Sequence, residues 1–323
     1  MKTRKLRLVS ALLAVAMMLA LLPTAAFAED STKIKYDCGK NGNNVIATLD
    51  TVTGVMTISG TGKMADYGKD METNITHNPL WANYKDKIKK LVVEGDVTSI
   101  GDDAFRGCIN LKNIDLSKAS SLEVIKTSFP VCTGLENVVL NEGLVEIGGS
   151  AFNNCKSLGS IHIPSTVTAI GGYCFEDCTN LSEVTFAAGS QLTKIAGATF
   201  IRCHGLEKIT IPKSVKEIRE YNNQGNKYGV FSGCRGLKSV IFEPGSELET
   251  VDEYAFASYW TLTIYCSDED TKVKEALNGK RNIGNIRSLT PTVTFDVDGT
   301  VIAKQNAKEN NFKAVKPVNP TIK

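Results

Sequence analysis

A motif of the form Phe-x-x-Cys-x-x-Leu recurs along the middle of the chain and limits the possible folds more than any other feature. Six copies are complete, and a seventh at Phe256 has Tyr259 in place of the cysteine. Successive phenylalanines are 24, 23, 23, 25, 31 and 25 residues apart. A repeat of this length predicts a solenoid in which each unit is one coil stacked on the next. The complete copies begin at Phe105, Phe129, Phe152, Phe175, Phe200 and Phe231.

Each of the first six copies is followed by two apolar residues that alternate with another residue. Alternation with a period of two predicts a strand with one face toward the interior. The Phe, Cys and Leu at intervals of three fit a tight turn that directs all three side chains inward. The fold expected is therefore mainly β, with about seven units and a cap at each end. The apolar pairs are Ile114/Leu116, Val138/Leu140, Ile161/Ile163, Val184/Phe186, Ile209/Ile211 and Val240/Phe242.

The full unit, Ile-Gly-x-x-Ala-Phe-x-x-Cys-x-x-Leu-x-x-Ile-x-Ile-Pro, resembles the BspA-type leucine-rich repeat of surface proteins from gut and oral bacteria. Residues 100–105 and 147–152 match its first part, and the runs 163–167 and 245–248 match its linking segment. The match covers Ile100 to Leu262, about half of the chain. The resemblance implies a curved leucine-rich-repeat solenoid with a short parallel sheet on its concave side. It also implies a surface adhesin that binds host or bacterial proteins.

Six of the nine cysteines occupy one position of the repeat, which predicts a ladder of buried thiols. Equivalent residues of neighbouring coils stack with parallel Cα–Cβ bonds about 4.8 Å apart. A disulfide instead needs Cβ atoms about 3.8 Å apart that lean toward each other. The stack also lacks the tetrahedral convergence of a metal site, so none is expected. The six are Cys108, Cys132, Cys155, Cys178, Cys203 and Cys234, and no role is assigned to Cys38, Cys174 and Cys266.

Residues 1–28 have the three parts of a secretory signal peptide: basic residues, an apolar run from Ala11 to Leu22, and the cleavage site Ala26-Phe27-Ala28. The apolar run is shorter than the ~20 residues that span a bilayer. The signal holds four of the 37 basic residues and none of the 35 acidic ones, which leaves 33 basic and 35 acidic groups. Without a basic cluster, neither nucleic acid nor an inserted membrane is an expected partner. The predicted location is secreted or cell surface.

The mature chain is expected to contain four segments: a β-rich N-terminal cap at 29–88, the solenoid at 89–264, a C-terminal cap at 265–288 and a partial β module at 289–323. In the first cap, Val45–Leu49 and Val55–Ser59 are predicted strands around a Thr53-Gly54 turn. Gly60-x-Gly62 lacks the third glycine and the following helix of a phosphate loop, so it predicts a turn. Asp268–Asn278 is a predicted short helix in the C-terminal cap.

The tail holds Phe295–Thr300, which copies the nucleophile motif of haloacid-dehalogenase-type phosphatases, with two aspartates and Mg²⁺. That motif requires a following α/β domain, and only 23 residues follow it, so a hairpin turned at Asp298-Gly299 is favoured. The hairpin resembles the opening of a Listeria–Bacteroides repeat, together with the stretch Pro317–Thr321. The expected ending of that repeat is absent before Lys323, so the sequence is predicted to be a fragment of a longer protein.

Catalysis is not expected, because the chemistry-bearing residues form no known pattern. The three histidines, His77, His162 and His204, have no metal-ligand spacing, and none accompanies a Ser or Cys nucleophile motif. The predicted protein is therefore not an enzyme and has no catalytic residue, metal or cofactor.

A binding surface is expected on the concave face, where the residue between the two buried ones of each strand points outward. Five of these six residues are uncharged and two are apolar, which suits an extracellular protein or peptide, or alternatively a glycan. They are Asp115, Val139, His162, Thr185, Thr210 and Ile241.

The second candidate surface is the eight-residue insertion between Ile218 and Phe231, because loops rich in tyrosine and asparagine suit recognition. It contains Tyr221 and Tyr228. The function expected is that of a secreted or cell-surface adhesin. The alternative is a structural stalk or accessory module that displays an enzyme encoded beyond the C-terminus.

Overall fold

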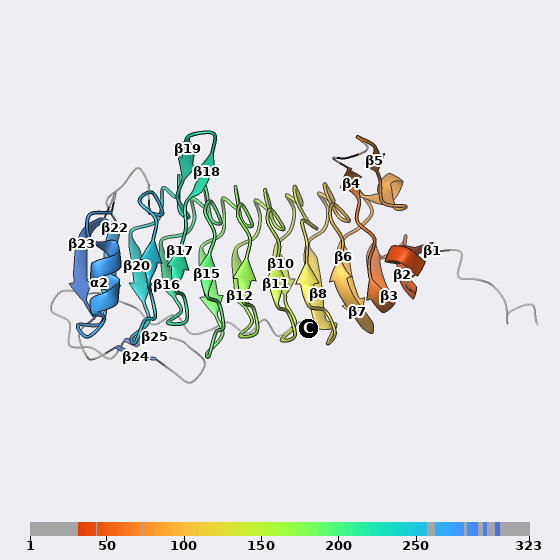
Figure 1. Ribbon diagram of the computed structural model, residues 1–323. Coiled ribbons are helices and arrows are strands. Elements are labelled where there is room, and N and C mark those ends of the chain that lie inside the picture. Colours follow the sequence, from red (N-terminus) through yellow and green to blue (C-terminus); the bar gives the residue numbers. More distant parts are fainter. Residues whose placement is uncertain are drawn as a thin grey trace, which may run out of the picture.

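The repeats form successive coils of one elongated solenoid, in which neighbours in sequence are neighbours in space (Figure 1). The computed structural model describes residues 32–289 without 43, 71, 73, 257–261 and 281–282, and also residues 293–295 and 301–303. The predicted signal peptide, the Asp298-Gly299 turn and Pro317–Thr321 lie outside these residues. No helix in the described part of the chain is long and apolar enough to cross a membrane.

The apolar pairs found in the sequence, except Leu140, lie on parallel strands, which we call the main ladder. Most neighbouring strands pair in register, as in Ile209↔Val240, and register shifts occur between β6 and β8 and between β22 and β23. The pairing stops between β10 and β12 and again between β14 and β16, which belong to different sheets. The strands are β6 (Lys90–Glu94), β8 (Asn113–Lys118), β10 (Asn137–Val139), β12 (Ser160–Ile163), β14 (Glu183–Phe186), β16 (Lys208–Ile211), β20 (Ser239–Phe242), β22 (Leu262–Cys266) and β23 (Ile283–Ser288).

The first interruption changes the burial of one predicted inward pair. Val138 and Leu140 are only half-buried, whereas the equivalent Ile161 and Ile163 are buried. β10 has no hydrogen-bonded strand on its C-terminal side, whereas β12 pairs with β14.

A second parallel ladder, which the sequence did not reveal, runs along another face of each coil and is unbroken from β3 to β21. Most of its strands have two residues, of which only the second is buried. A single buried residue produces no alternation, and this is why the pattern gave no strand signal. The strands are β7 (Asp96–Ile100), β9 (Val124–Ile125), β11 (Glu146–Ile147), β13 (Ala169–Ile170), β15 (Lys194–Ile195), β17 (Glu217–Ile218) and β21 (Thr250–Val251).

Both ladders begin on β3 (Val55–Lys63), whose first half pairs with β6 and whose second half pairs with β7. β3 also pairs with β2 (Asn44–Asp50), which in turn pairs with β1 (Lys33–Asp37), so the two predicted N-terminal strands are confirmed. The predicted turn at Gly60-x-Gly62 is wrong, because both glycines lie within β3. Gly60 has a φ of +109°, and a Cβ there would lie 1.8 Å from the Asn44 carbonyl oxygen, so only glycine allows this bend beside β2.

The core is a continuous stack of aromatic rings, one from each coil. The ring centroids of Phe105, Phe129 and the following phenylalanines to Phe256 are 5.4–6.0 Å apart, with interplanar angles of 3–22°. Trp81 extends the stack at its N-terminal end, 5.5 Å from Phe105. The turns that hold the rings have backbone hydrogen bonds such as Cys108 N to Phe105 O and Leu111 N to Cys108 O, as the spacing of three predicted.

All nine cysteines are buried and free. In five of the six ladder positions the thiol donates to the phenylalanine carbonyl of the preceding coil, at 2.8–3.5 Å. Cys174 lies outside the ladder at the small-residue position before Phe175, where other coils have Ala104 and Ala151.

The C-terminal end is covered by α2 (Thr271–Leu277), which buries Val273 and Leu277. The helix begins three residues later than the predicted Asp268, because Asp270 is committed to loop contacts. Its carboxylate accepts backbone N–H groups from Gly245, Ser246 and Ser267. Two short 3₁₀ helices, η2 (Lys40–Gly42) and η3 (Ala82–Tyr84), lie in the N-terminal part. In the tail, β24 (Val293–Phe295) and β25 (Val301–Ala303) pair antiparallel, as expected of a hairpin.

Candidate binding surfaces

The outward residues of the main ladder meet in three separate pairs. The strand register places Asp115 beside Val139, His162 beside Thr185, and Thr210 beside Ile241. The pairs do not form one unbroken row, since the ladder is interrupted between the first and second pair and between the second and third.

The exposure of these residues differs from the prediction at one position. His162 and Thr185 are exposed, and the imidazole Nδ1 and the threonine hydroxyl are 2.8 Å apart in a hydrogen bond. Asp115, Val139 and Thr210 are half-buried. Ile241 is only 6% exposed, so its predicted place on a solvated face is wrong. It lies on a strand paired on both sides, between Thr210 and Tyr265, whose large side chain shares its face.

Asp115 is held in place by its own strand. Its carboxylate accepts the Ser117 backbone N–H at 3.1 Å and the Ser117 hydroxyl at 2.7 Å. Burial raises the pKa of Asp115, but these hydrogen bonds and nearby Lys90 outweigh burial, so the pKa lies below its ordinary value. The group is therefore a fixed negative charge at neutral pH.

The predicted insertion forms a hairpin of β18 (Tyr221–Asn223) and β19 (Asn226–Tyr228), which projects from the edge of the solenoid (Figure 1). Gln224 and Gly225 have φ angles of 50° and 90°, as a tight two-residue hairpin turn requires. Tyr221 and Tyr228 are each 37% exposed.

Three contacts fix the base of this hairpin. The rings of Tyr221 and Tyr173 meet edge to face, with centroids 4.8 Å apart. Burial raises the pKa of Tyr173 to about 12, and the Tyr221 hydroxyl adds to the effect. On the other side, Lys227 pairs with Glu220 at 2.9 Å and lies 4.6 Å above the Tyr254 ring. These contacts hold the hairpin in a fixed position on the surface.

A second hairpin, β4 (Gly68–Lys69) and β5 (Thr76–His77), projects from the same edge near the N-terminal end (Figure 1). It follows β3 and precedes Trp81, just as β18–β19 follows β17 and precedes Phe231. The sequence pattern does not predict this hairpin, because the insertion is recognisable only once Trp81 is known to take the place of a repeat phenylalanine.

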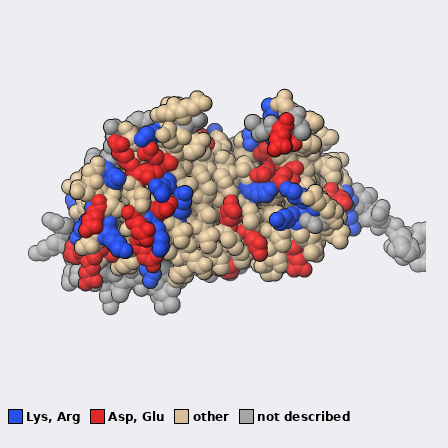
Figure 2. Space-filling view, in the orientation of Figure 1, with Lys and Arg blue, Asp and Glu red and all other residues tan. Residues whose placement is uncertain are grey.

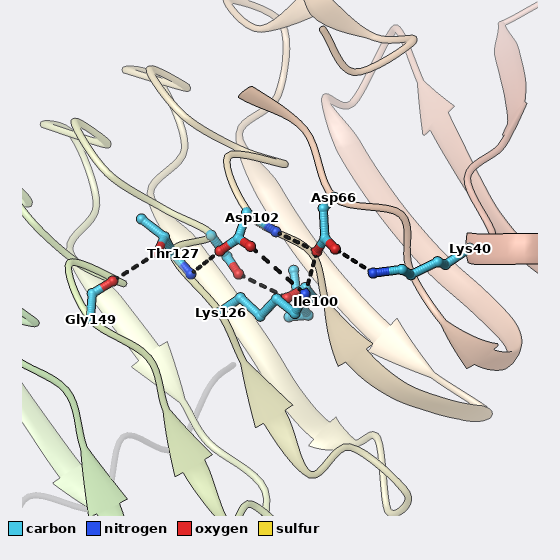
Figure 3. A network of polar contacts seen from close by, with 8 residues as sticks. Lys40, Asp66, Ile100, Asp102, Lys126, Thr127 and Gly149 are labelled. Atoms are coloured by element: carbon cyan, nitrogen blue, oxygen red, sulfur yellow. Dashed lines mark hydrogen bonds and ion pairs between the residues drawn. The ribbon is translucent and has the colours of Figure 1, made fainter. Parts of the chain in front are cut away.

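A polar network lies under the β4–β5 hairpin (Figure 3). Asp66 accepts hydrogen bonds from Lys40 and Lys126, both at 2.6 Å, and from the Asp102 backbone N–H at 3.2 Å. Burial raises the pKa of Asp66, but the two lysines outweigh burial, and the pKa lies below its ordinary value. Asp102 in turn accepts the Thr127 backbone N–H at 3.0 Å.

This network borders a pocket of about 490 Å³ between the hairpin and the first coils. Its lining includes Asp66, Asp70, His77, Asp102 and Asp103. Lysines neutralise Asp66, and Arg106 pairs with Asp103 at 3.3 Å. Among the described residues, no group of three or more His, Cys, Asp or Glu side chains is placed to hold a metal ion.

Charged side chains gather over the two ends of the face shown in Figure 2, and mainly uncharged residues lie between the two projections. We call the coil edge between the hairpins the hairpin saddle: residues 101–104, 126–128, 148–151, 171–174 and 196–199. Its N-terminal end is charged and contains Asp102, Asp103 and Lys126. Glycines occur along this edge, because the backbones of neighbouring coils approach too closely there for a side chain. A Cβ on Gly171 would lie 2.3 Å from the Gly149 nitrogen, and one on Gly197 would lie 2.0 Å from the Tyr221 nitrogen.

Comparison with protein families gives one match, to a model described as "BspA type Leucine rich repeat region". Six copies match over residues 79–129, 98–228 and 227–290. These ranges run without a break from 79 to 290, well over half of the 323-residue chain. No curated protein sequence is significantly similar to the chain.

Several solved structures are similar to this chain at low sequence identity. A leucine-rich repeat protein of T. pallidum is 22% identical, with 62% of this chain and 81% of that chain covered and a TM-score of 0.39. One from Bacteroides ovatus is 19% identical, with coverage of 78% and 90% and a TM-score of 0.34. The pneumococcal vaccine antigen PcpA is 14% identical, with coverage of 78% and 98% and a TM-score of 0.26.

Proposed function

This chain belongs to the BspA-type leucine-rich repeat family, and on that premise we propose that it is a secreted or cell-surface adhesin. It binds extracellular proteins or peptides through the surface of its solenoid. The family is one of repeat scaffolds, and the proposal assigns no catalytic step and no cofactor to the chain.

The observation that carries the proposal is that two exposed side chains on the main ladder are fixed by a hydrogen bond to each other. His162 and Thr185 are bonded to each other while their strands are fixed by register pairing. A surface fixed before binding loses little conformational freedom when a partner docks. The half-buried Val139 adds an apolar contact one coil away, beside the carboxylate of Asp115, and this mixture of apolar and polar groups suits a protein partner.

Binding of residues 29–323 to immobilised extracellular-matrix proteins and bacterial surface glycans tests this proposal. We expect saturable binding to at least one matrix protein. Val139→Asp combined with Thr185→Asp introduces two charges on the main ladder, and we expect it to weaken binding about tenfold or more, ~1.4 kcal/mol. Ile241 is not substituted, because a charge at this buried position would test stability.

Val145→Asp is the matched control, because Val145 is 41% exposed and borders the second ladder. It introduces one negative charge on another face and should bind like the native chain. Equal loss in both variants would reject the main ladder as the site. An absence of binding to every matrix protein would reject the adhesin proposal.

A further inference from the structure

The β4–β5 hairpin carries a sequence motif that the proposed binding function does not use. Its tip reads Asn74-Ile75-Thr76, and Asn-x-Ser or Asn-x-Thr is the acceptor motif for N-linked glycans where x is not proline. The sequence has one other copy of this motif, Asn180-Leu181-Ser182. Because a transferase must take the acceptor segment into its own active site, the structural surroundings of each copy decide whether it can react.

The Asn74 copy lies in the turn of a hairpin that projects from the solenoid (Figure 1). All three of its residues are exposed, and the apolar one, Ile75, is 55% exposed. Asn74 has a φ of 60°, a left-handed turn conformation that asparagine accepts readily. The Asp70 backbone N–H closes the turn by donating to the Ile75 carbonyl at 2.8 Å. Because none of the three motif side chains is buried, this segment can open locally at low cost.

The Asn180 copy, in contrast, is part of a coil. Leu181 is fully buried, and its backbone N–H donates to the Cys178 carbonyl at 3.0 Å. Ser182 is tied to the preceding coil, because its hydroxyl and its backbone N–H donate to the Gly159 carbonyl at 3.1 and 2.9 Å. This copy reaches an active site only if Leu181 leaves the core, so the fold presents Asn74 and protects Asn180.

The residue two positions before each asparagine separates the two copies further. Bacterial enzymes that transfer N-linked glycans favour an acidic residue there, because its carboxylate pairs with a basic group of the enzyme. Before Asn74 this residue is the exposed Glu72, whose backbone N–H donates to the Asp70 carboxylate at 2.8 Å. Before Asn180 it is the fully buried Cys178. Only the Asn74 copy therefore combines the motif with an accessible carboxylate.

We propose that Asn74 is an N-glycosylation site. The donor is an oligosaccharide joined to a lipid through pyrophosphate. The Nδ2 atom of Asn74 attacks the anomeric carbon of the first sugar and forms a C–N bond. The bond from that carbon to the pyrophosphate oxygen breaks, the lipid pyrophosphate leaves with the electron pair, and Nδ2 gives one proton to a base of the enzyme. The transfer takes place outside the cytoplasm, so the inference rests on the predicted signal peptide and goes beyond the proposed adhesin function.

The test is peptide mapping by mass spectrometry of the mature chain, purified from the organism that produces it. Trypsin cleaves after Lys69 and Lys85, and the resulting peptide 70–85 contains Asn74 in its only acceptor motif. We expect this peptide to be heavier by the mass of an oligosaccharide, which fragmentation locates on Asn74. Tryptic peptide 157–194 contains the Asn180 copy and should have the mass of its unmodified sequence.

Variants produced in the same cells identify the acceptor. Thr76→Ala removes the hydroxyl of the motif and should abolish the modification of peptide 70–85, whereas Thr76→Ser keeps the hydroxyl and should retain it. Glu72→Gln should lower the modified fraction. Ser182→Ala is the matched control for Thr76→Ala, because it destroys the other copy of the motif, and it should leave peptide 70–85 modified as in the native chain.

Three outcomes overturn the proposal. The first is a native peptide 70–85 with the mass of its unmodified sequence. The second is a mass increase that persists in Asn74→Gln, because the sugar is then attached to another residue such as Thr76. The third is equal modification of Asn180 and Asn74, which would show that the fold does not select between the two copies.

Discussion

At the scale of single residues, each of the first six coils has a left-handed position two residues after its phenylalanine. Gly107, Asn154 and Asp177 occupy this position in three coils, with φ angles of 57–72°. These residue types accept such a conformation at low cost. Val131 occupies it in the second coil with a φ of 64°, although a β-branched side chain is strongly disfavoured there. This valine is therefore a local weakness in an otherwise regular repeat.

We expect Val131→Asn to raise the free energy of unfolding by about 1 kcal/mol, because it removes this backbone strain. Val131 is 36% exposed, so the substitution loses little burial. Urea denaturation followed by circular dichroism measures the change. Gly107→Val is the converse control: a Cβ there meets nothing within 4 Å, so the loss in stability comes from the backbone alone. If Val131→Asn leaves the free energy of unfolding unchanged or lowers it, the backbone at Val131 is not strained.

The buried ladder thiols make the free energy of unfolding depend on pH in the alkaline range. Burial raises the pKa of Cys108 and Cys178 from an ordinary 9.0 to about 12. Above pH 9 the unfolded chain loses these protons while the folded chain keeps them. The stability is therefore complete below pH 9 and falls as the pH rises toward 12, by about 1.4 kcal/mol per pH unit for each such thiol.

Unfolding midpoints in urea between pH 8 and 10.5 should show this decline. Tyrosine and lysine also titrate in that range, so Cys178→Ala is compared with the native chain. We expect the variant to be less stable at pH 8, because a cavity is left in the core, and to lose less stability per pH unit. Parallel declines in the two proteins would mean that the thiol at this position does not contribute.

At the scale of elements, the N-terminal part supplies the contacts that a preceding repeat would make with the coil of Phe105. In later coils the phenylalanine backbone N–H donates to a carbonyl of the next coil, as Phe129 N does to Ala151 O. Among the described residues no repeat phenylalanine precedes Phe105. Trp81 stands in its place, and its indole Nε1 donates to the Ala104 carbonyl at 3.0 Å. One side chain thus continues both the ring stack and the hydrogen-bond ladder.

Trp81→Phe separates these two roles. Phenylalanine keeps a ring beside Phe105 but leaves the buried Ala104 carbonyl without its donor, which costs about 1–3 kcal/mol. Trp81→Ala removes the ring as well and should cost about 3–5 kcal/mol. Thermal and urea unfolding of the three proteins measure the difference. If Trp81→Phe is as stable as the native chain, the indole hydrogen bond is not part of the cap.

The elements also show where prediction from sequence succeeds. The phenylalanine turns and main-ladder strands are predictable, because several side chains per coil face one interior and repeat in phase. The second ladder is not, since each short strand contributes one buried residue such as Ile147 or Ile170. Among the candidate site residues, Ile241 shows the limit: its exposure depends on Tyr265, a neighbour from the next coil that alternation along its own strand does not identify.

At the scale of the whole molecule, the two ladders do not hold the coils together equally. The second ladder pairs continuously, whereas the main ladder stops twice, before β12 and before β16. Within the described residues, the solenoid is thus joined along one face and divided into three blocks along the other. The candidate pair His162–Thr185 belongs to the middle block, which consists of β12 and β14.

This division predicts uneven hydrogen exchange along the main ladder. Where strands pair, backbone groups of neighbouring coils bond to each other, and such amides exchange slowly. β12 and β16 lack a paired strand toward the preceding coil, whereas β14 and β20 have one. Mass-spectrometric exchange should therefore be faster for peptides covering 160–163 and 208–211 than for those covering 183–186 and 239–242. The second-ladder peptides serve as the internal control and should be protected evenly from β9 to β17. Uniform protection on both faces would mean that the coils are joined equally and that the middle block does not open independently of its neighbours.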